Sequence, residues 1–419
     1  MSAPAAEIVA RARAAFDQRC FGRAAELCEV GLNRQPPAEL EAALRALREE
    51  AKRSLDPPPA HAVPPPPIFW AGTELFGRGA FTEAAALFRK ALDETPASAQ
   101  VRAHLGMALV GAGEFAEGFA HLESRRHLAW AGARKMAAPL WDGRPMRGKT
   151  LVLWDEQGHG DAIQFVRFAG PAAAHSGARV VFQGRPRLCR LFRRCPGIAE
   201  SLPRPGPVPR PDAHASLMSL PALLGCGQDQ LADTVPYLSA EPELLESWRR
   251  QLGSRVRPRI GLFWQGNPGF HDDRRRSFPL STYLPLLGRF RAGADFISLQ
   301  KWAGEDQLAQ LPPDLSLPNL GAALDRSEDG FVETAAVLSQ LDLLITSDSA
   351  IAHLAGGLGT RVWVLLGCGA DWRWGESPTA TPFYPTMRLY RRREEEPWSD
   401  VAARVGDALQ LLLAQGGSP

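Results

Sequence analysis

The sequence predicts an α/β protein in which two doubly wound domains follow an all-α helical repeat module. Two observations carry this prediction: an interval of 34 residues recurs near the N-terminus, and from Lys149 onward short apolar runs alternate with amphipathic helical patterns. Strands of a parallel sheet are covered on both faces, so they read as such runs. A chain of 419 residues with 45% hydrophobic content is long enough to bury the separate cores that this architecture needs.

The repeat module carries a clear periodicity. Gly72, Gly79, Phe81 and Glu83 recur as Gly106, Gly113, Phe115 and Glu117. Small and large residues in this spacing let two antiparallel helices pack closely, and the pattern resembles the tetratricopeptide repeat. We therefore expect such repeats over residues 68–138.

A weaker copy of the repeat is expected earlier in the chain, so that residues 1–55 form a degenerate helical repeat. Its residues are Phe21, Ala24, Cys28 and Pro36, and a further helix is predicted from about Glu39 to Ser54. Residues 56–67 are rich in proline, which removes backbone donors and favours extended geometry. This segment is predicted to be a semi-rigid linker, with a ligand for an SH3-type domain as the alternative.

The rest of the chain divides into two series of predicted strands. The first series lies within residues 139–240 and comprises Thr150–Asp155, Arg179–Gln183 and Ala213–Leu217. The second lies within residues 241–395 and comprises Ile260–Gln265, Phe296–Gln300, Leu341–Thr346, Val362–Leu366 and Met387–Tyr390. A C-terminal helix is expected over residues 396–419. Because ligands of open parallel sheets lie beyond the carboxyl ends of the strands, the residues just after each strand are candidates for a site.

Charge and hydropathy exclude some classes of partner. With 48 basic and 46 acidic residues and a net charge of +2, the chain has no overall field that would gather nucleic acid, so no nucleic-acid partner is expected. No apolar run approaches the roughly 18 residues of a membrane-spanning helix, and the N-terminus lacks the apolar core of a signal peptide. These features predict a cytoplasmic protein without a transmembrane segment.

Two nucleotide-binding motifs match only in part. Residues 143–150, GRPMRGKT, fit the P-loop pattern by letter, but they precede a predicted strand instead of opening a helix. A P-loop nucleotidase is therefore a distant alternative. In the loop after that strand, a nicotinamide fingerprint would need a third glycine at the position of Ile163, which disfavours a dehydrogenase.

The loop after the first strand is the first candidate site. Gln157, Gly158, His159 and Gly160 lead into a predicted helix, and the glycines permit close backbone approach to a ligand. Asp161 stands at the start of that helix. The local sequence leaves two roles open for it, a helix cap or a catalytic base.

Polar residues also follow the first two strands of the second series. Gln265 and Asn267 come directly after the first strand, and Gln300 ends the next one. The loop between these strands carries three consecutive arginines, Arg274, Arg275 and Arg276. Arginines at a sheet edge are suited to clamp a diphosphate through bidentate bonds, and a solvated charge run is the alternative.

A third candidate lies where the strand at 341–346 passes into a helix of small residues. Asp348, Ser349 and Ala350 open this helix, whose N-terminus offers N–H groups and a positive dipole end to a phosphate, while the small residues let a ligand come close. His353 lies one turn further on the side of Ser349, with a structural histidine as the alternative. Trp372 follows the strand at 362–366 and is suited either to stacking on a ligand or to core packing.

Taken in order, EQGHGDAIQF, FWQGNP, RRRSFP, ISLQ and TSDSAIAHLAGGLG resemble glycosyltransferase family 9, the heptosyltransferase-like enzymes. The resemblance covers about residues 139–412. It is strongest with a bacterial subset in which tetratricopeptide repeats precede the transferase, and PLWDG at 139–143 and FYPTMRL at 383–389 are further landmarks of that subset.

This resemblance implies a GT-B fold, with residues 139–240 as the Rossmann-like acceptor domain and 241–395 as the nucleotide-sugar domain. It also implies an inverting, metal-independent transfer that needs no cofactor. Asp161 becomes the general base, Arg276 contacts the donor diphosphate, and Asp348 and Ser349 bind sugar and phosphate with support from His353. The expected donor site is completed by Gln265, Asn267, Arg274, Arg275, Gln300, Ala350 and Trp372, and the acceptor side by Gln157, Gly158, His159 and Gly160.

Two residues depart from the family pattern. Ala350 replaces the usual glycine, and Ser277 replaces a basic residue that can follow in heptosyltransferases, so ADP-heptose is not carried over as the donor. The sequence thus predicts a glycosyltransferase that moves a sugar from a nucleotide-sugar donor to a protein, such as flagellin or another surface protein, or to a glycan selected by the repeats. A non-catalytic repeat scaffold with a degenerate nucleotide-sugar-binding domain is the alternative, and Ala350 favours it.

Overall fold

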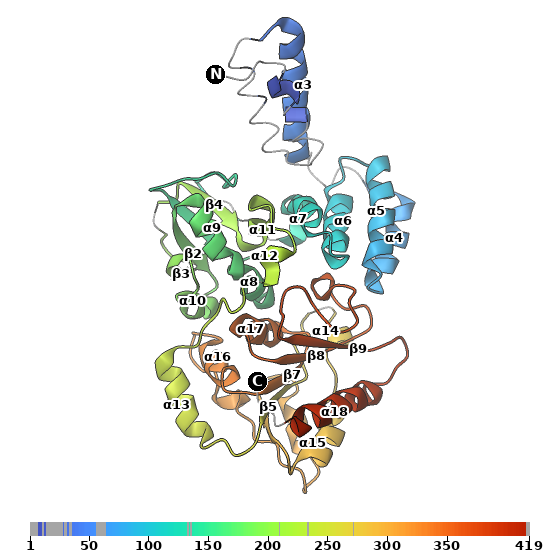
Figure 1. Ribbon diagram of the computed structural model, residues 1–419, viewed down its shortest axis with the longest axis vertical. Coiled ribbons are helices and arrows are strands. Elements are labelled where there is room, and N and C mark those ends of the chain that lie inside the picture. The colour runs from blue at the N-terminus through green and yellow to red at the C-terminus, as the bar shows by residue number, and fades with distance from the viewer. Residues whose placement is uncertain are drawn as a thin grey trace. The chain divides into compact units, whose positions relative to one another are not determined.

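The computed structural model describes residues 7–10, 12–13, 28, 32, 36–55, 64–131, 134, 136–208, 210–232, 234–270 and 272–415. They belong to two compact units: a helical unit within residues 1–133, and an α/β unit that comprises residues 134–419 with the short segments 75–81 and 111–113. The predicted fold class is confirmed, because an all-α segment precedes two parallel sheets of the Rossmann-like, GT-B type (Figure 1).

The helical unit is built from pairs of helices that recur at the predicted interval. Its elements are α3 (Ala38–Leu55), α4 (Pro67–Gly77), α5 (Phe81–Glu94), α6 (Ala99–Gly111), α7 (Phe115–Leu122), η2 (Glu123–His127) and η3 (Ala129–Ala131). Glycine is needed where these helices touch, since a Cβ atom on Gly72 would lie 2.7 Å from the ring of Phe88. Arg89 joins α5 to α7 by donating to Glu114 and Glu117 at 2.8 and 3.3 Å. Membership of the tetratricopeptide family stays a prediction.

The predicted helix from Glu39 to Ser54 is confirmed as α3, which contributes Leu44 and Leu47 to a small buried cluster with Ala12 and Cys28. Other predictions for this region lie outside the described residues. They are the repeat positions Phe21 and Ala24, residues 56–63 of the proline-rich linker, and residues 416–419 of the C-terminal helix.

The first sheet is parallel throughout and has the strand order β3-β2-β1-β4. Its strands are β1 (Thr150–Trp154), β2 (Arg179–Gly184), β3 (Ile198–Pro203) and β4 (Ala213–Ser216). The helical segments around it are α8 (His159–Phe165), η4 (Val166–Phe168), α9 (Ala169–Ser176), α10 (Pro186–Phe192), η5 (Leu217–Ser219), α11 (Leu220–Leu223) and α12 (Asp229–Ala232). The residues that resemble a P-loop form a turn into β1, and no helix follows them.

Strand β3 was not predicted from the sequence. It lies at the edge of the sheet, and only Ile198 and Ser201 of its six residues are buried. The segment IAESLP therefore has no continuous apolar run, which is the signal that central strands of a parallel sheet provide.

The second sheet is also parallel throughout, in the order β6-β5-β7-β8-β9. Its strands are β5 (Arg259–Phe263), β6 (Asp295–Ser298), β7 (Leu343–Ser347), β8 (Val362–Leu366) and β9 (Met387–Arg391). Its helical segments are α13 (Pro242–Leu252), α14 (Asp273–Arg276), η6 (Leu280–Tyr283), α15 (Leu284–Phe290), η7 (Glu305–Gln310), η8 (Gly321–Ala323), α16 (Val332–Leu338), α17 (Ala350–Leu358), η9 (Trp372–Trp374) and α18 (Trp398–Ala414).

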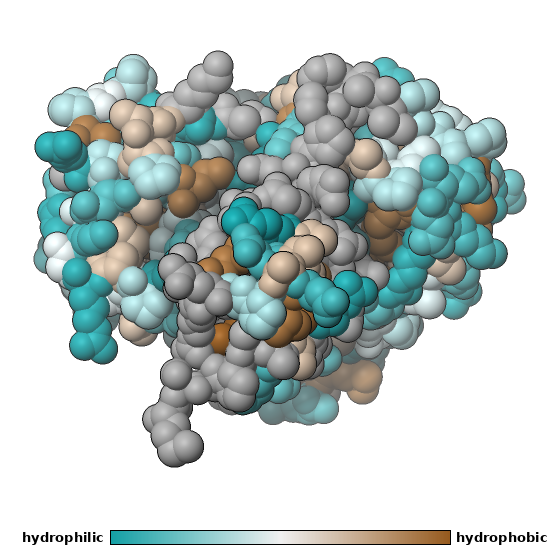
Figure 2. Space-filling model, turned by 90° about the horizontal axis from the view of Figure 1, so that it is seen from above, coloured by the Kyte–Doolittle hydropathy of each residue, from teal (hydrophilic) through white to brown (hydrophobic). Residues whose placement is uncertain are grey.

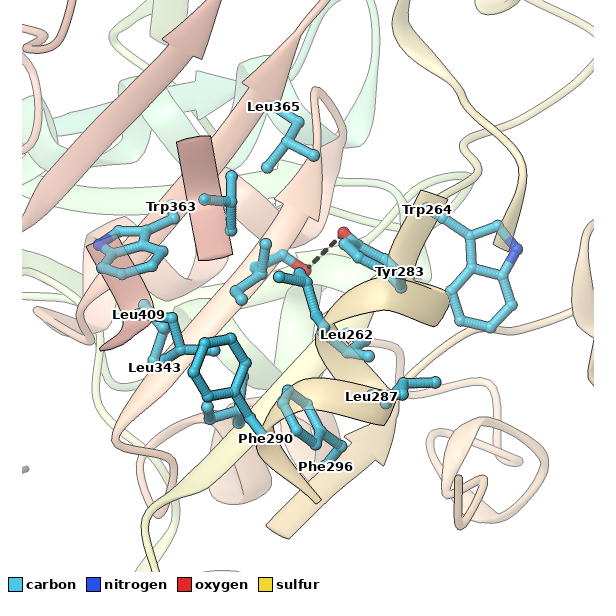
Figure 3. Packing of buried hydrophobic residues seen from close by; sticks show 14 of the residues in the cluster. Leu262, Trp264, Tyr283, Leu287, Phe290, Phe296, Leu343, Trp363, Leu365 and Leu409 are labelled. Carbon is cyan, nitrogen blue, oxygen red and sulfur yellow. Dashed lines mark hydrogen bonds between the residues drawn. The ribbon is translucent and has the colours of Figure 1, made fainter. Parts of the chain in front are cut away.

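The second sheet buries one face under α15 and α18 (Figure 1). Apolar side chains of β5, β7 and β8 meet Leu287, Phe290 and Leu409 from these helices (Figure 3). Tyr283 is fully buried in this core, and its hydroxyl donates to the carbonyl oxygens of Phe263 and Ile345, each at 3.1 Å. These bonds tie the segment before α15 to two neighbouring strands.

A buried arginine joins the two sheets within the α/β unit. Arg167 lies in η4, and its guanidinium donates to the carbonyl oxygens of Leu231 and Phe383 at 3.0 and 2.7 Å. It also lies over the rings of Tyr237 and Tyr384, 4.6 Å from each centroid. Aromatic faces and carbonyl oxygens stabilise a cation that would otherwise be costly to bury.

Among the coloured residues on the face shown in Figure 2, hydrophobic residues lie in small groups among hydrophilic ones. The large apolar side chains exposed on the described residues are Trp70, Leu140, Val256, Phe270, Trp302 and Leu411. None of the described helices combines the length and the apolar character that crossing a bilayer requires.

We predict that Tyr283→Phe lowers the free energy of unfolding by about 1–3 kcal/mol, because it removes a donor that two buried carbonyl groups share. Tyr390→Phe is the matched control. Tyr390 belongs to the same core, and its buried hydroxyl has no hydrogen-bond partner among the described residues, so a change within about 0.5 kcal/mol is expected. Urea unfolding measures both variants, and equal losses would contradict this account of the core.

Candidate active site

An arginine that directly follows β2 holds the loop between β1 and α8. Arg185 donates to Asp155 at 2.6 Å, and it also donates to the carbonyl oxygen of Gln157. The Asp155 side chain is completely buried. Gln157 adopts a left-handed conformation with φ of 57°, so this ion pair fixes a strained turn just before the first helix.

Asp161 fills one of the two roles that the local sequence left open, that of a helix cap. Its Oδ2 accepts the backbone N–H of Gly158 at 2.7 Å, which caps the N-terminus of α8. Its Oδ1 accepts a hydrogen bond from Arg373, which lies in η9 after strand β8 of the second sheet. The carboxylate is thus oriented by its own helix and also faces the other domain.

The N-terminus of α17 follows β7 directly. Ser349 is the N-cap residue, and its side chain makes no capping bond. Its buried hydroxyl has no hydrogen-bond partner among the residues that the structure describes. A buried, unpartnered hydroxyl at the positive end of a helix is a suitable contact for an anionic group.

Helices α8 and α17 approach each other at Gly160. A Cβ atom on Gly160 would lie 3.6 Å from the Cα atom of Ala350 and 3.1 Å from the Cδ2 atom of His353. A larger residue would push the two helices apart. The small size of Gly160 therefore brings the Asp161 loop to the N-terminus of α17.

His353 lies in a closed environment beside this contact. Its Nδ1 atom pairs with the Tyr384 hydroxyl at 2.9 Å, and its ring stacks on Trp374 with centroids 5.0 Å apart. Burial lowers the pKa of His353 to about 3, and the nearby charges of Arg373 and Arg167 act in the same direction. His353 is therefore neutral near pH 7 and contributes hydrogen bonding and packing, not positive charge.

The glycines of α17 serve packing within the protein. A Cβ atom on Gly356 would lie 2.5 Å from the ring of Tyr384, and one on Gly357 would lie 2.9 Å from the ring of Tyr237. We expected small residues along this helix to let a ligand approach. The structure shows that at these two positions they make room for tyrosine rings.

The arginine cluster is divided between exposed and anchored side chains. Arg274 and Arg275 are exposed on the short helix α14. Arg276 is partly buried: its Nε donates to the buried carboxylate of Asp273 at 3.2 Å, and its guanidinium lies 4.4 Å from the ring centroid of Phe270. Of the three arginines, Arg276 has its guanidinium held in one position.

Ser277 takes part in the same anchor. Its hydroxyl donates to Asp273 at 3.0 Å and accepts the backbone N–H of Gly266 at 3.0 Å. A Cβ atom on Gly266 would lie 3.0 Å from the Nη2 atom of Arg276, so the loop after β5 passes directly beside the guanidinium. The serine that departs from the family pattern thus fixes the loop that carries Arg276.

The remaining polar residues of this sheet edge bond mainly to the protein itself. The Gln300 amide accepts the backbone N–H groups of Trp264 and Gln265 at 3.0 and 3.1 Å, and it donates to the carbonyl oxygen of Ala303 at 2.7 Å. Gln265 accepts from the Gln307 side chain at 3.2 Å. Asn267 is exposed and closes its own turn. The structure therefore brings Asp161, Arg276, Asp348, Ser349, Ala350 and His353 together. Gln265, Gln300 and Asn267 bond within the surrounding loops, and Arg274 and Arg275 are exposed.

Asp348 carries the unusual ionisation of the site. Burial and the neighbouring charge of Asp371 raise the pKa of Asp348 to about 6, while Arg276 and Arg373 oppose the increase. Near pH 6 the protonated and ionised forms of this carboxyl are both populated, so it can donate to or accept from a sugar or ribose hydroxyl.

Arg373 and Asp371 were missed as site residues by sequence reasoning. The segment DWRW after β8 was considered only for its aromatic rings, yet Trp372 is buried and one face of its ring is covered by the Arg373 guanidinium, 4.2 Å from the centroid. Arg373 also donates to Asp371 at 2.8 Å. Its position after a strand of a parallel sheet was the available signal.

The chemistry open to this group of residues is proton transfer beside a developing negative charge. Within the described ranges, no group of three or more His, Cys, Asp and Glu side chains is placed to hold a metal ion. The positive groups that face the site are the guanidinium groups of Arg276 and Arg373 and the N-terminus of α17.

Comparison with known proteins gives one curated relative. No family model matches this sequence. Protein FlbA of Caulobacter vibrioides is 26% identical over 341 residues, which are 73% of this chain and 54% of FlbA. The chain is a distant relative of FlbA and spans about half of its length.

Solved structures of glycosyltransferases are similar to part or most of the chain. The Escherichia coli ADP-heptose lipopolysaccharide heptosyltransferase II is 17% identical, covers 65% of this chain with 100% of its own length, and has a TM-score of 0.47. A family 9 glycosyltransferase from Veillonella parvula is 13% identical, and the similar region comprises 66% of this chain and 100% of the transferase, with a TM-score of 0.49. A mutant O-GlcNAc transferase from Thermobaculum terrenum is 15% identical, and the similar region comprises 99% of this chain and 92% of that transferase, with a TM-score of 0.31.

We predict that Asp348→Asn stabilises the protein at alkaline pH. A carboxyl whose pKa is higher in the folded state than in the unfolded chain destabilises the fold once the pH exceeds the folded value, because the folded state must then lose a proton that it holds more tightly. The variant should gain about 1–2 kcal/mol in the free energy of unfolding at pH 8, and the gain should vanish below about pH 4.

Asp407→Asn is the control for this prediction, since its carboxyl is 76% exposed on α18. Urea unfolding at pH 4 and pH 8 measures both variants against the wild type, which cancels the contribution of His353 and other groups. If Asp348→Asn is no more stable than the wild type at pH 8, the proposed environment of Asp348 is wrong.

Proposed function

We propose that this protein is an inverting, metal-independent glycosyltransferase that moves a sugar from a nucleotide-sugar donor to a protein or glycan acceptor. The observation that carries the proposal is the meeting of α8 and α17 at Gly160. This contact sets the loop that carries Asp161, at the edge of one parallel sheet, beside the N-terminal end of a helix from the other.

The proposed reaction assigns a balanced role to each group. The acceptor hydroxyl oxygen attacks the anomeric carbon of the donor, and its proton passes to the carboxylate of Asp161. The bond between that carbon and the diphosphate oxygen breaks, and its electron pair leaves with the nucleoside diphosphate. A positioned carboxylate contributes about 10²- to 10⁴-fold to such a step.

The leaving group gathers negative charge as the bond breaks, so the site has to supply fixed positive charge. Arg276 is anchored by Asp273, and the N-terminus of α17 presents the Ser349 hydroxyl. Groups that are held in place before the reaction stabilise developing charge without having to reorganise. We assign the diphosphate to this pair of elements.

The helical unit is the proposed source of acceptor selection. Paired helices that recur at a 34-residue interval form surfaces suited to extended partners. A protein acceptor, such as flagellin or another surface protein, fits this arrangement, and a glycan is the other acceptor class that we propose.

A second candidate is a non-catalytic scaffold with a degenerate nucleotide-sugar site. Two observations favour it: Ala350 stands where the family that the sequence resembles has glycine, and both carboxylate oxygens of Asp161 are already hydrogen-bonded. Binding of a nucleotide sugar without turnover is the result that distinguishes this candidate from an enzyme.

A thermal-shift screen of UDP, GDP, ADP, CMP and dTDP derivatives tests the proposed donor class. A ligand that binds the folded state alone raises the melting temperature by mass action, and at a concentration of 100 Kd it stabilises by about 2.7 kcal/mol. We expect one base to shift the intact chain more than the others. If none does at millimolar concentration, both candidate functions lose their basis.

We predict that Asp161→Asn retains nucleotide binding and loses transfer by about 10²-fold or more, because the amide cannot take up the acceptor proton. Asp142→Asn is the control, an exposed carboxylate of the same domain. Transfer is measured with the donor that the screen identifies. Full activity of Asp161→Asn would exclude Asp161 as the base.

We also predict that Arg276→Ala weakens the binding of the nucleoside diphosphate by about 10-fold and leaves the affinity for the nucleoside unchanged, because we assign its guanidinium to the phosphates alone. Arg289→Ala is the control, because that arginine pairs with a surface carboxylate of the same domain. Calorimetric titration gives both affinities. Equal losses for nucleoside and diphosphate would place Arg276 away from the phosphates.

A further inference from the structure

Arg373 lies at the centre of three carboxylates. Its Nη2 donates to Asp161 from the first domain, and its Nη1 donates to Asp371 at 2.8 Å from its own loop. Its charge also acts on Asp348 at the end of β7. The side chain is only 10% exposed. The buried guanidinium therefore joins carboxylates from both domains, and its attraction to them holds it in place.

This environment leaves Arg373 incompletely satisfied. Its buried Nε–H has no hydrogen-bond partner among the described residues, although leaving such a group unpaired is costly. The guanidinium also lies over the Trp372 ring, with its Cζ atom 4.2 Å from the ring centroid. An additional anionic acceptor would complete its hydrogen bonding.

The proposed diphosphate position supplies such an acceptor. Asp161 pairs with Arg373 and follows Gly160, which abuts Ala350 at the N-terminus of α17. Phosphate oxygens bound at that terminus would therefore lie near the guanidinium of Arg373, which in this structure is paired with Asp161. Arginine binds phosphate oxygens as readily as carboxylates, so the two anions compete for the same donors.

We infer that Arg373 exchanges partners during the reaction. In the free enzyme it pairs with Asp161, and when the donor is bound it turns to the diphosphate and releases a carboxylate oxygen of Asp161 toward the acceptor hydroxyl. This inference rests on the proposed function. It makes the availability of the base depend on the presence of the donor, and it gives the leaving group a second arginine beside Arg276.

A double-mutant cycle with inorganic pyrophosphate as the probe tests the exchange in the intact chain. Calorimetric titration should show that Arg373→Gln weakens pyrophosphate binding about 10-fold, because a charge-assisted partner is lost. Asp161→Asn should tighten binding by about 3-fold or more, because it weakens the competing pair. In the Arg373→Gln background the same Asp161→Asn change should have little effect. Arg291→Gln, which alters an exposed arginine paired with Asp314, is the control and should bind like the wild type.

The outcomes separate this inference from the function on which it rests. If Asp161→Asn changes the affinity equally in both backgrounds, or if Arg373→Gln binds like the wild type, the exchange is refuted while the glycosyltransferase proposal stands. If the wild type binds neither pyrophosphate nor any nucleoside diphosphate, both fail together.

Tryptophan fluorescence provides a readout that does not need an Arg373 variant to fold. When the guanidinium turns toward a bound anion, the environment of Trp372 changes, because the two groups are in contact. Pyrophosphate should alter the emission of the wild type, and most of that change should be absent in Trp372→Phe. An identical change in both proteins would contradict the movement of Arg373.

Discussion

Both sheets of the α/β unit are parallel, and this constraint determines where chemistry is possible in the chain. A parallel strand has to be followed by a crossover that covers one face of the sheet, so every strand points its carboxyl end toward the same edge. The loops after β1, β5, β7 and β8 lie at such edges, and they supply Asp161, Arg276, Ser349 and Arg373. The core under α15 and α18 contains none of these groups, and its task is to hold the edges in place.

Charged groups at the candidate site are positioned by other charged groups, and several of them also hold local structure. Asp161 caps α8 and meets Arg373, while Asp273 anchors Arg276 and Ser277. Such pairing offsets the cost of burying ions and orients them before a ligand arrives. Ser277 belongs to the same anchor, because its hydroxyl fixes the loop that presents the neighbouring arginine.

Sequence patterns predicted what depends on local composition and missed what depends on distant partners. The central strands and the helix α3 follow from apolar runs and helical periodicity, whereas edge strand β3 has no such run. The placement of Asp161 at a helix start was predictable, but its partner Arg373 is 212 positions away, and a single arginine carries little information in an arginine-rich chain. Gln300 was expected at the donor, and the structure shows its amide bonded to the backbone of the surrounding loops. The spacing of residues in the sequence does not reveal that a side chain is hydrogen-bonded to the loops around it.

The central claim is that a sugar is transferred with inversion in a site built from both sheets. The most direct test is to incubate the intact chain with the nucleotide sugars of the base that it binds, and to follow nucleoside diphosphate release and the anomeric configuration of the product by NMR spectroscopy. The account predicts release from at least one donor, with a product of inverted configuration. Binding of a nucleotide sugar without any release, in the presence of acceptor proteins and glycans, would contradict it and support a scaffold.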